Sequence, residues 1–249
     1  MELEKEYFFA LVDFEAGDKW SDHLEVWKKG LKLTNCAWIR YKAWKGEFPE
    51  EAELNIIQGI VIPGAAPSAN NNWNEGYAFV KRIAERGKPQ LYGGCFGAQL
   101  LAASLGGIVD SNPSKKLCFQ SEQINLLSDW YKHPVLGCVG NRPNKPLEQD
   151  KVRLLESHGE CVIQLPPGAT LAASSKTTAN EVWFIGSNIL AMQAHPEFTP
   201  ELLIKRVLPT FVKLGRLNEK EVLHAHSSFS KSLDSDIICD LIRQFLSFR

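Results

Sequence analysis

The chain has 249 residues, 44% of them hydrophobic, which is enough to build the core of one large domain. Its 28 basic and 29 acidic residues give a net charge of −1, so no excess of charge favours a nucleic acid or a membrane surface as a partner. The apolar runs fall far short of the ~20 residues of a membrane-spanning helix, and the acidic N-terminus does not have the pattern of a signal peptide.

Residues 1–107 alternate between strand-like and helix-like segments. Tyr7–Phe14 is a nearly continuous apolar run, which predicts a strand buried on both faces. Ser21 is expected to cap a helix that turns Leu24, Trp27 and Leu31 inward. The alternation predicts an α/β fold, a mostly parallel open sheet with helices on both faces. The other predicted elements of this half are strands at Ala37–Tyr41, Gly59–Pro63 and Gln90–Gly94, and helices at Trp73–Arg86 and Ala98–Leu105.

The second half of the chain is rich in strand-like segments, with hardly a helix between them. Gly186-Ser187-Asn188 is expected to form a hairpin turn between the last two strands, so this half adds antiparallel strands. Arg142–Asp150 carries two prolines and several charges, which predicts a loop. The predicted strands are Leu117–Leu127, Val152–His158, Cys161–Leu165, Thr170–Ser175, Val182–Ser187 and Ile189–Ala194.

Helices are expected again near the C-terminus. Thr199 is a suitable N-cap for a helix with Pro200 at its first position, and Pro209 is expected to kink or end that helix. A last helix begins near Ser235, with apolar residues three and four positions apart that predict a face docked on the core. We expect one domain over residues 1–249.

Six cysteines are scattered along the chain without CxxC pairs. A disulfide framework is typical of short secreted chains, so we expect reduced thiols, most of them buried, and a cytoplasmic protein. No cluster of residues has the spacing of metal ligands, and neither a metal nor another cofactor is expected.

The segment around Cys95 carries the strongest chemical signal. A predicted strand runs into Gly93-Gly94-Cys95-Phe96-Gly97 and out into a predicted helix, the pattern of a nucleophile elbow. The glycines permit a tight turn, the helix N-terminus favours the thiolate of Cys95, and the N–H of Phe96 is placed to stabilise an oxyanion. The alternative is a buried cysteine in a glycine-rich turn.

A second signal lies 100 residues downstream, in His195-Pro196-Glu197. Pro196 favours an extended conformation of His195, so the side chains of His195 and Glu197 tend to project from the same side. Glu197 can then bind one ring nitrogen of His195 and leave the other facing the thiol. On its own this triplet is more often a turn, but together with the elbow it predicts a Cys95–His195–Glu197 triad.

These motifs resemble the class I glutamine amidotransferases, which have a flavodoxin-like sheet and a Cys-His-Glu triad. The resemblance covers Tyr7 to Leu203 and includes three further segments, Ile60–Gly64, Glu156–His158 and Leu165–Ala169. Among the members, the chain looks nearest to the stand-alone γ-glutamyl peptidases.

The resemblance implies roles for further residues. Gln99, Ser157 and His158 would hold the amino-acid head of a γ-glutamyl group, although His158 could also be a strand-end histidine without a role. The oxyanion hole would combine the backbone of Phe96 with that of Gly64. The loop proline is displaced by one position from the family pattern, which leaves Gly64 and Ala65 open as donors.

The sequence therefore predicts an enzyme that hydrolyses the γ-glutamyl amide or peptide bond of a small-molecule substrate through a thioester on Cys95. Two alternatives stay open: a glutaminase subunit that delivers ammonia to a separate synthase, and a non-catalytic binding domain. The chain itself has no phosphate-binding loop of the kind that an ATP-using synthase needs.

Overall fold

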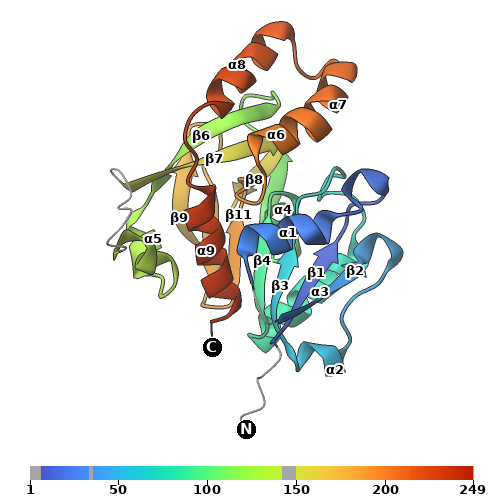
Figure 1. The fold of residues 1–249 in the computed structure, drawn as a ribbon. Coiled ribbons are helices and arrows are strands. Elements are labelled where there is room, and N and C mark those ends of the chain that lie inside the picture. Colours follow the sequence, from blue (N-terminus) through green and yellow to red (C-terminus); the bar gives the residue numbers. More distant parts are fainter. Residues whose placement is uncertain (1–6, 34–35, 142–149, 249) are drawn as a thin grey trace.

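A computed structural model describes residues 7–33, 36–141 and 150–248 (Figure 1). Nine strands form the large sheet in the order β2-β1-β3-β4-β11-β10-β9-β6-β7, and β5 pairs with β8 in a small second sheet. From β2 to β11 neighbouring strands are parallel, and from β11 to β7 they are antiparallel. The strands are β1 (Tyr7–Asp13), β2 (Cys36–Lys42), β3 (Ile57–Ile62), β4 (Gln90–Gly94), β5 (Ile108–Ser111), β6 (Cys118–Leu126), β7 (Lys151–His158), β8 (Glu160–Gln164), β9 (Thr170–Ser175), β10 (Val182–Ile185) and β11 (Ile189–Met192).

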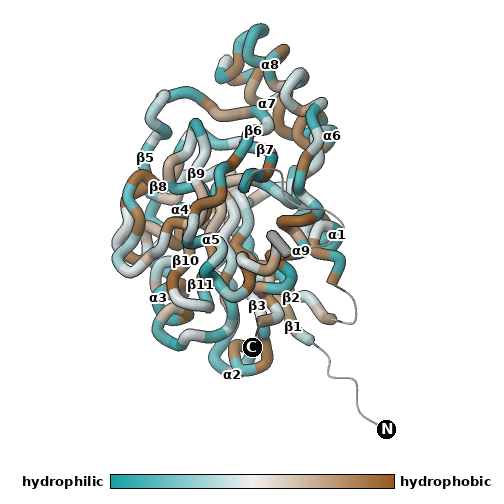
Figure 2. Tube along the Cα trace, turned by 90° about the vertical axis from the view of Figure 1, so that its left-hand side faces the viewer, coloured by the Kyte–Doolittle hydropathy of each residue, from teal (hydrophilic) through white to brown (hydrophobic). Residues whose placement is uncertain are grey.

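Helices cover both faces of the parallel half, as the alternating sequence predicts (Figure 1). On one face, α1 (His23–Leu31) and α9 (Ser235–Leu246) bury a core that includes Trp27 and Phe245. On the other face, α3 (Asn74–Arg86) and α4 (Phe96–Ser104) bury a second core. Apolar segments follow the strands, whereas many peripheral loops are hydrophilic (Figure 2).

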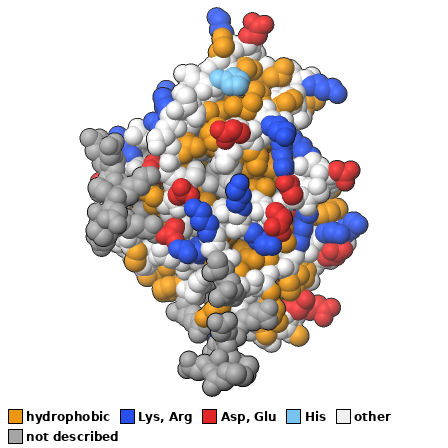
Figure 3. All heavy atoms as spheres, viewed as in Figure 1, with side chains coloured by type: hydrophobic (Ala, Val, Ile, Leu, Met, Phe, Trp, Pro, Cys, Tyr) orange, Lys and Arg blue, Asp and Glu red, His pale blue; other side chains and the backbone are white. Residues whose placement is uncertain are grey.

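The antiparallel end of the sheet carries a third cluster. There α6 (Pro200–Leu202), the π-helical turn η5 (Leu203–Val207), α7 (Leu208–Lys213) and α8 (Glu219–Phe229) lie against β6 and β7 (Figure 1). Phe119, Leu155 and Phe198 belong to the buried cluster between them. Positive and negative side chains are intermixed on the face shown in Figure 3, in keeping with the balanced charge of the sequence.

Several short elements complete the fold. They are η1 (Asp18–Trp20), η2 (Ala43–Lys45), α2 (Glu51–Leu54), α5 (Ser128–Lys132) and η3 (Leu136–Asn141). The helices α2, α5 and α8 and the strand β5 were not predicted from the sequence, because α2, α5 and β5 are short and α8 is interrupted by polar residues. The predicted loop at Arg142–Asp150 falls almost wholly outside the described residues.

Three boundaries differ from the prediction. Ser21 does not cap α1: its N–H binds the carbonyl of Asp18 at the end of η1, and Asp22 is the N-cap residue. The helix α4 begins at Phe96, directly after Cys95, and so two residues earlier than predicted. The helix that was expected to kink or end at Pro209 is interrupted just before it, by the π-helical turn Leu203–Val207, and Pro209 lies at the start of α7.

Candidate active site

Cys95 lies at the tip of a sharp turn between β4 and α4. Its φ of 49° is in the left-handed region, which a residue with a side chain rarely adopts. Its N–H binds the carbonyl of Met192 at 2.8 Å, and its own carbonyl accepts from the N–H of Gln99 at 3.1 Å. The turn therefore holds the thiol at the carboxyl end of the central parallel strands, where open α/β sheets bind ligands.

Two glycines make this turn possible. A Cβ on Gly97 would stand 2.0 Å from the carbonyl oxygen of Ile62, and one on Gly93 would stand 2.6 Å from the carbonyl carbon of Gly97. Both contacts are with backbone, which cannot move aside cheaply. Gly94 differs, since the nearest atom to its Cβ would be on Tyr92 at 3.4 Å, an ordinary contact.

His195 lies just beyond β11, on a segment held by backbone hydrogen bonds. Its N–H binds the carbonyl of Leu155 at 2.8 Å, and the N–H of Ala194 binds the carboxyl group of Glu181 at 3.0 Å. The ring of Phe198 stacks on the imidazole at a centroid distance of 4.6 Å. The imidazole is therefore fixed in position from two sides before any substrate enters.

Glu197 binds the imidazole of His195, and Gly64 lies against both the imidazole and Cys95. His195 Nδ1 and Glu197 Oε1 are 2.8 Å apart, and both residues are buried. A Cβ on Gly64 would lie 2.9 Å from His195 Cε1 and 3.5 Å from the Cβ of Cys95. The structure thus brings the three predicted catalytic residues together around one glycine.

The charges at this site favour a protonated imidazole. Burial by itself would lower the pKa of His195, but the neighbouring Glu197 and the Cys95 side chain raise that pKa well above its usual range. The imidazole is therefore suited to hold a proton beside the Cys95 sulfur, with Glu197 stabilising the positive charge.

The candidate oxyanion donors are placed differently. Phe96 is the first residue of α4, so its N–H is among the donors that a helix leaves without a partner inside the helix. Gly64 adjoins both Cys95 and His195, whereas Ala65 packs against the core on the side of α3 and α4. Of the two alternatives left open by the sequence, the geometry favours Gly64.

The predicted substrate-binding residues lie at the end of β7 and beside α4. The amide of Gln99 donates to the carbonyl of Glu160 at 2.9 Å, which ties α4 to the turn after β7. Ser157 is half-buried, and the antiparallel register puts it opposite Phe119. Gln99 therefore contacts the residue that follows the β7–β8 turn, and Ser157 lies on the strand that leads into that turn.

His158 has less room for a substrate. Its Nδ1 is 2.9 Å from the carbonyl of Glu160, and its Nε2 is 3.4 Å from both Thr178 Oγ1 and Glu156 Oε2. Both ring nitrogens thus have neighbours in the protein, and the side chain is buried. This arrangement favours the alternative in which the imidazole is structural.

Comparison with known proteins identifies the family. The sequence profile of "Glutamine amidotransferase class-I" matches residues 32–214, which is most of the chain. The chain belongs to the class I glutamine amidotransferase family. Its flavodoxin-like fold follows from the same comparison: a glutamine amidotransferase structure from Thermotoga maritima superposes with a TM-score of 0.71 at 16% identity, covering 96% of this chain and 98% of that one.

Relatives within this family include enzymes of two kinds. The chain is 30% identical to γ-glutamyl peptidase 4 of Arabidopsis thaliana over 221 residues, which are 84% of this chain and 83% of that protein. It is 29% identical to γ-glutamyl peptidase 5 of the same plant and spans 64% of that protein's length. It is also 29% identical to the glutamine-hydrolysing GMP synthase of Marinobacter nauticus, covering 64% of this chain but only 29% of the synthase.

Two further features bear on how this family member works. In the described part of the chain, no helix is long and apolar enough to cross a membrane, and no group of three or more His, Cys, Asp or Glu residues could hold a metal ion. All six cysteines are free. Burial raises the pKa of several of the other thiols, to about 11 for Cys161 and about 12 for Cys239, which keeps them protonated and unreactive.

A buried group of carboxyls beside the site was missed in the sequence. Glu156 and Glu181 are fully buried, and the nearest ring nitrogen to Glu156 is Nε2 of His158, at 3.4 Å from Oε2. Burial and the charge of Glu122 raise the pKa of Glu156 to about 8, and burial and Glu156 raise that of Glu181 well above its usual range. Both carboxyls therefore favour the protonated form at neutral pH. The sequence signal that could have revealed this group is Glu156, which shares the inward face of a predicted strand with Leu154 and His158.

This group predicts an unusual dependence of stability on pH. The folded state raises the pKa of Glu156 from 4.5 to about 8, so its contribution to stability is complete below about pH 4.5 and is lost as the pH rises through 8. We expect Glu156→Gln to raise the free energy of unfolding by about 1–3 kcal/mol at pH 8.5 and to change it little at pH 4.5. The amide can donate to Glu181 and to His158 without holding a titratable proton.

Urea unfolding of the two proteins at several pH values measures this difference. The exposed Glu85→Gln is the matched control, because it removes the same charge from the surface of α3. A Glu156→Gln curve that runs parallel to that of the unmodified protein over the whole pH range would contradict the prediction.

Proposed function

We propose that the chain is a thiol hydrolase that cleaves γ-glutamyl amide or peptide bonds. The observation that carries this proposal is the meeting of the Cys95 elbow with the His195–Glu197 hydrogen bond around Gly64. The names of its peptidase relatives support the γ-glutamyl group as the part of the substrate that is recognised. The six free thiols support a reducing, cytoplasmic location.

The proposed reaction has two stages. The thiolate of Cys95 attacks the γ-carbonyl carbon, and the N–H groups of Phe96 and Gly64 stabilise the oxyanion. His195 then gives its proton to the departing nitrogen, the C–N bond breaks, and a γ-glutamyl thioester remains on Cys95. In the second stage a water loses a proton to His195 and attacks the thioester, which releases glutamate and restores the thiolate. No cofactor takes part in these steps.

Recognition of the glutamyl head is assigned to the region between α4 and the end of β7. There Gln99 and Ser157 offer polar groups near the turn of Cys95, and the backbone of His158 is the third candidate. A site that pairs these groups with the amino and carboxylate groups of the head leaves them unpaired when the peptide is α-linked.

The second candidate function is a glutaminase that passes ammonia to a separate synthase subunit. The similarity to part of a GMP synthase favours it, because that relative contains more chain than the matched region. The two candidates differ in the activity of the isolated chain. A peptidase is expected to be active without a partner, whereas a glutaminase subunit is expected to need its synthase.

The test is glutamate release by the purified chain from γ-linked and α-linked isomers of one dipeptide. We expect hydrolysis of the γ-linked isomer without a partner, and a preference of roughly 10⁴-fold over the α-linked isomer. A Cys95→Ala preparation, purified in the same way, controls for contaminating peptidases. Release of ammonia from glutamine only after a synthase is added, with no γ-linked peptide cleaved, would establish the second candidate instead.

A further inference from the structure

An exposed guanidinium lies against the turn that follows β7. The helix α7 ends at Lys213, and Gly215, with a φ of 64°, turns the chain so that the N–H of Arg216 binds the carbonyl of Phe211 at 2.9 Å. The guanidinium of Arg216 then stacks over the ring of Phe211 at 5.4 Å. Its Nη2 lies 2.7 Å from the point where a Cβ on Gly159 would stand. The end of α7 therefore places a cation directly on Gly159.

Gly159 belongs to the same turn as the proposed recognition site for the glutamyl head. It follows Ser157 and His158 and precedes Glu160, whose carbonyl accepts from the Gln99 amide at 2.9 Å. The N–H of Gln99 in turn binds the carbonyl of Cys95. Two hydrogen bonds thus connect Cys95 to the residue after Gly159, and Arg216 contacts the turn to which α4 is tied in this way.

The charge of Arg216 is not used by the fold. Two other arginines of the same region are paired: Arg206 makes two hydrogen bonds with Asp22, and Arg40 makes two with Asp13. Within the described ranges, Arg216 has only the ring of Phe211 as a partner, and its side chain is exposed. A stacked guanidinium is held in place, while its edge stays free to bind a carboxylate through two parallel hydrogen bonds.

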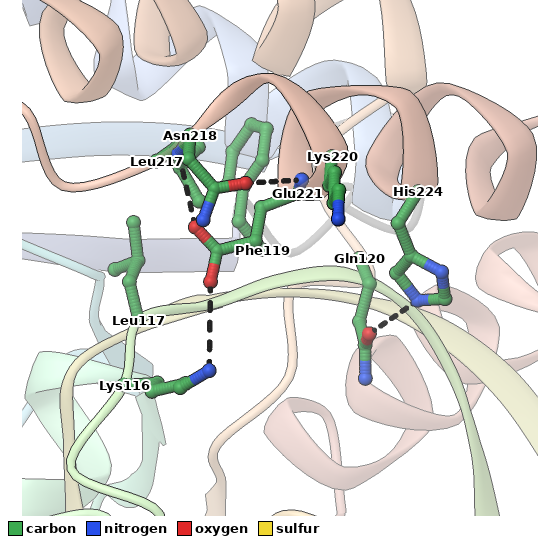
Figure 4. A pocket seen from close by; sticks show the side chains of 9 residues that line it. All are labelled: Lys116, Leu117, Phe119, Gln120, Leu217, Asn218, Lys220, Glu221 and His224. Carbon is green, nitrogen blue, oxygen red and sulfur yellow. Dashed lines mark hydrogen bonds and ion pairs between the residues drawn. The ribbon is translucent and has the colours of Figure 1, made fainter.

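A pocket of about 300 Å³ adjoins this position (Figure 4). Leu217, the residue after Arg216, lines it together with Leu117, which precedes the Cys118–His158 pair of β6 and β7. Lys116 and Lys220 add positive charge to its wall, and Lys116 is 3.9 Å from the carboxylate of Glu221. The surface beyond Arg216 is therefore hollowed, and Lys220 is a further cation on its wall, whereas the charge of Lys116 is paired with Glu221.

Building on the proposed function, we propose that Arg216 binds a carboxylate of the γ-glutamyl substrate and so determines specificity. A γ-glutamyl dipeptide has two carboxylates that could occupy this position, the α-carboxylate of the glutamyl head and the terminal carboxylate of the departing amino acid. Both present the same planar anion to the guanidinium, and the choice of substrate distinguishes them.

The experiment compares the KM and kcat of Arg216→Ala and the unmodified protein on γ-glutamylglycine, γ-glutamylglycinamide and glutamine. We expect KM for γ-glutamylglycine to rise at least about tenfold, with kcat within about threefold, because the lost contact is made equally before and during the reaction. A rise for all three substrates assigns the head carboxylate. A rise for γ-glutamylglycine alone assigns the carboxylate of the departing residue.

Three controls separate this role from a structural one. Lys220→Ala removes a cation from the pocket wall and is expected to leave all three KM values within about twofold. Gly159→Ala keeps the charge but displaces the guanidinium, and is expected to raise the same KM values as Arg216→Ala by a smaller factor. Arg216→Lys keeps the positive charge but not the planar guanidinium. Its KM values are expected to lie between those of the unmodified protein and those of Arg216→Ala.

Unchanged KM values on all three substrates, in an active Arg216→Ala protein, overturn the assignment of Arg216 and leave the proposed function intact. An equal effect of Lys220→Ala overturns it too, because the cause is then general charge. Failure of the unmodified protein on every γ-glutamyl substrate defeats the proposed function itself. Binding of γ-glutamylglycine to Cys95→Ala, with and without Arg216→Ala, gives a calorimetric measurement independent of turnover.

Discussion

Replacing Cys95 with alanine is expected to abolish γ-glutamyl hydrolysis, lowering kcat by at least about 10⁴-fold. The variant keeps the elbow but has no atom that can form the thioester, so neither stage of the proposed reaction can begin. Glutamate release, followed over days at high protein concentration, measures the residual rate. Denaturation of the intact substrate complex, followed by mass spectrometry, shows a γ-glutamyl adduct only where Cys95 is present.

His195 and Glu197 distinguish a triad from a lone reactive cysteine. His195→Ala is expected to lose nearly as much activity as Cys95→Ala, and the double variant little more, because the two residues act as one unit. Glu197→Gln is expected to retain more activity than either, since it orients and stabilises the imidazole without transferring a proton. Full activity of His195→Ala would rule out the proposed mechanism, even if Cys95 proved essential.

The chemistry could be predicted from the sequence because its signals are local. Gly93 and Gly97 flank Cys95 within a segment of five residues. Glycine is required at both positions because backbone atoms lie where a Cβ would be. His195 and Glu197 are two positions apart, and the turn at Pro196 and Glu197 brings the imidazole and the carboxylate to 2.8 Å. Such patterns can be recognised without knowledge of the fold, since the geometry that they require lies within one turn or one strand.

The features that escaped prediction depend on contacts between distant segments. Glu156 and Glu181 come from β7 and from the approach to β10, and only the antiparallel pairing of the sheet brings the two carboxyls into one buried site. Arg216 is an ordinary surface arginine in the sequence, and its position on Gly159 follows from the turn at Gly215 after α7. The sequence also left two roles open for His158, because its ring contacts with Glu160 and Thr178 lie outside its own strand.

The helix boundaries show a related limit. Ser21 has the right chemistry for an N-cap, but the preceding 3-10 turn, which buries Trp20 against Phe198, holds Ser21 in a helical conformation (φ −56°, ψ −29°), which an N-cap residue does not adopt. Tertiary packing outweighs the local preference there, because a stacked pair of aromatic rings contributes more than one capping hydrogen bond. The helix after Thr199 was predicted to kink or end at Pro209, and the structure interrupts it slightly earlier, where the π-helical turn Leu203–Val207 precedes the proline.

Gly97→Ala is expected to be among the most damaging single-methyl changes in the molecule, lowering the free energy of unfolding by about 3 kcal/mol or more. The added Cβ would stand 2.0 Å from the carbonyl oxygen of Ile62, so α4 must move away from β3 or the turn must open. Gly94→Ala is the matched control, three residues earlier in the same turn. Its Cβ meets Tyr92 at 3.4 Å, and its φ is not in the left-handed region.

The control variant is expected to unfold within about 1 kcal/mol of the unmodified protein, because an alanine at a tolerated position also restricts the unfolded chain. Urea unfolding of the three proteins, followed by tryptophan fluorescence, gives the comparison. Because α4 carries Phe96 and Gln99 as well as the end of the elbow, any folded fraction of Gly97→Ala is also expected to be inactive. Equal stability of the two variants would show that the close approach of α4 to β3 is not what requires glycine at position 97.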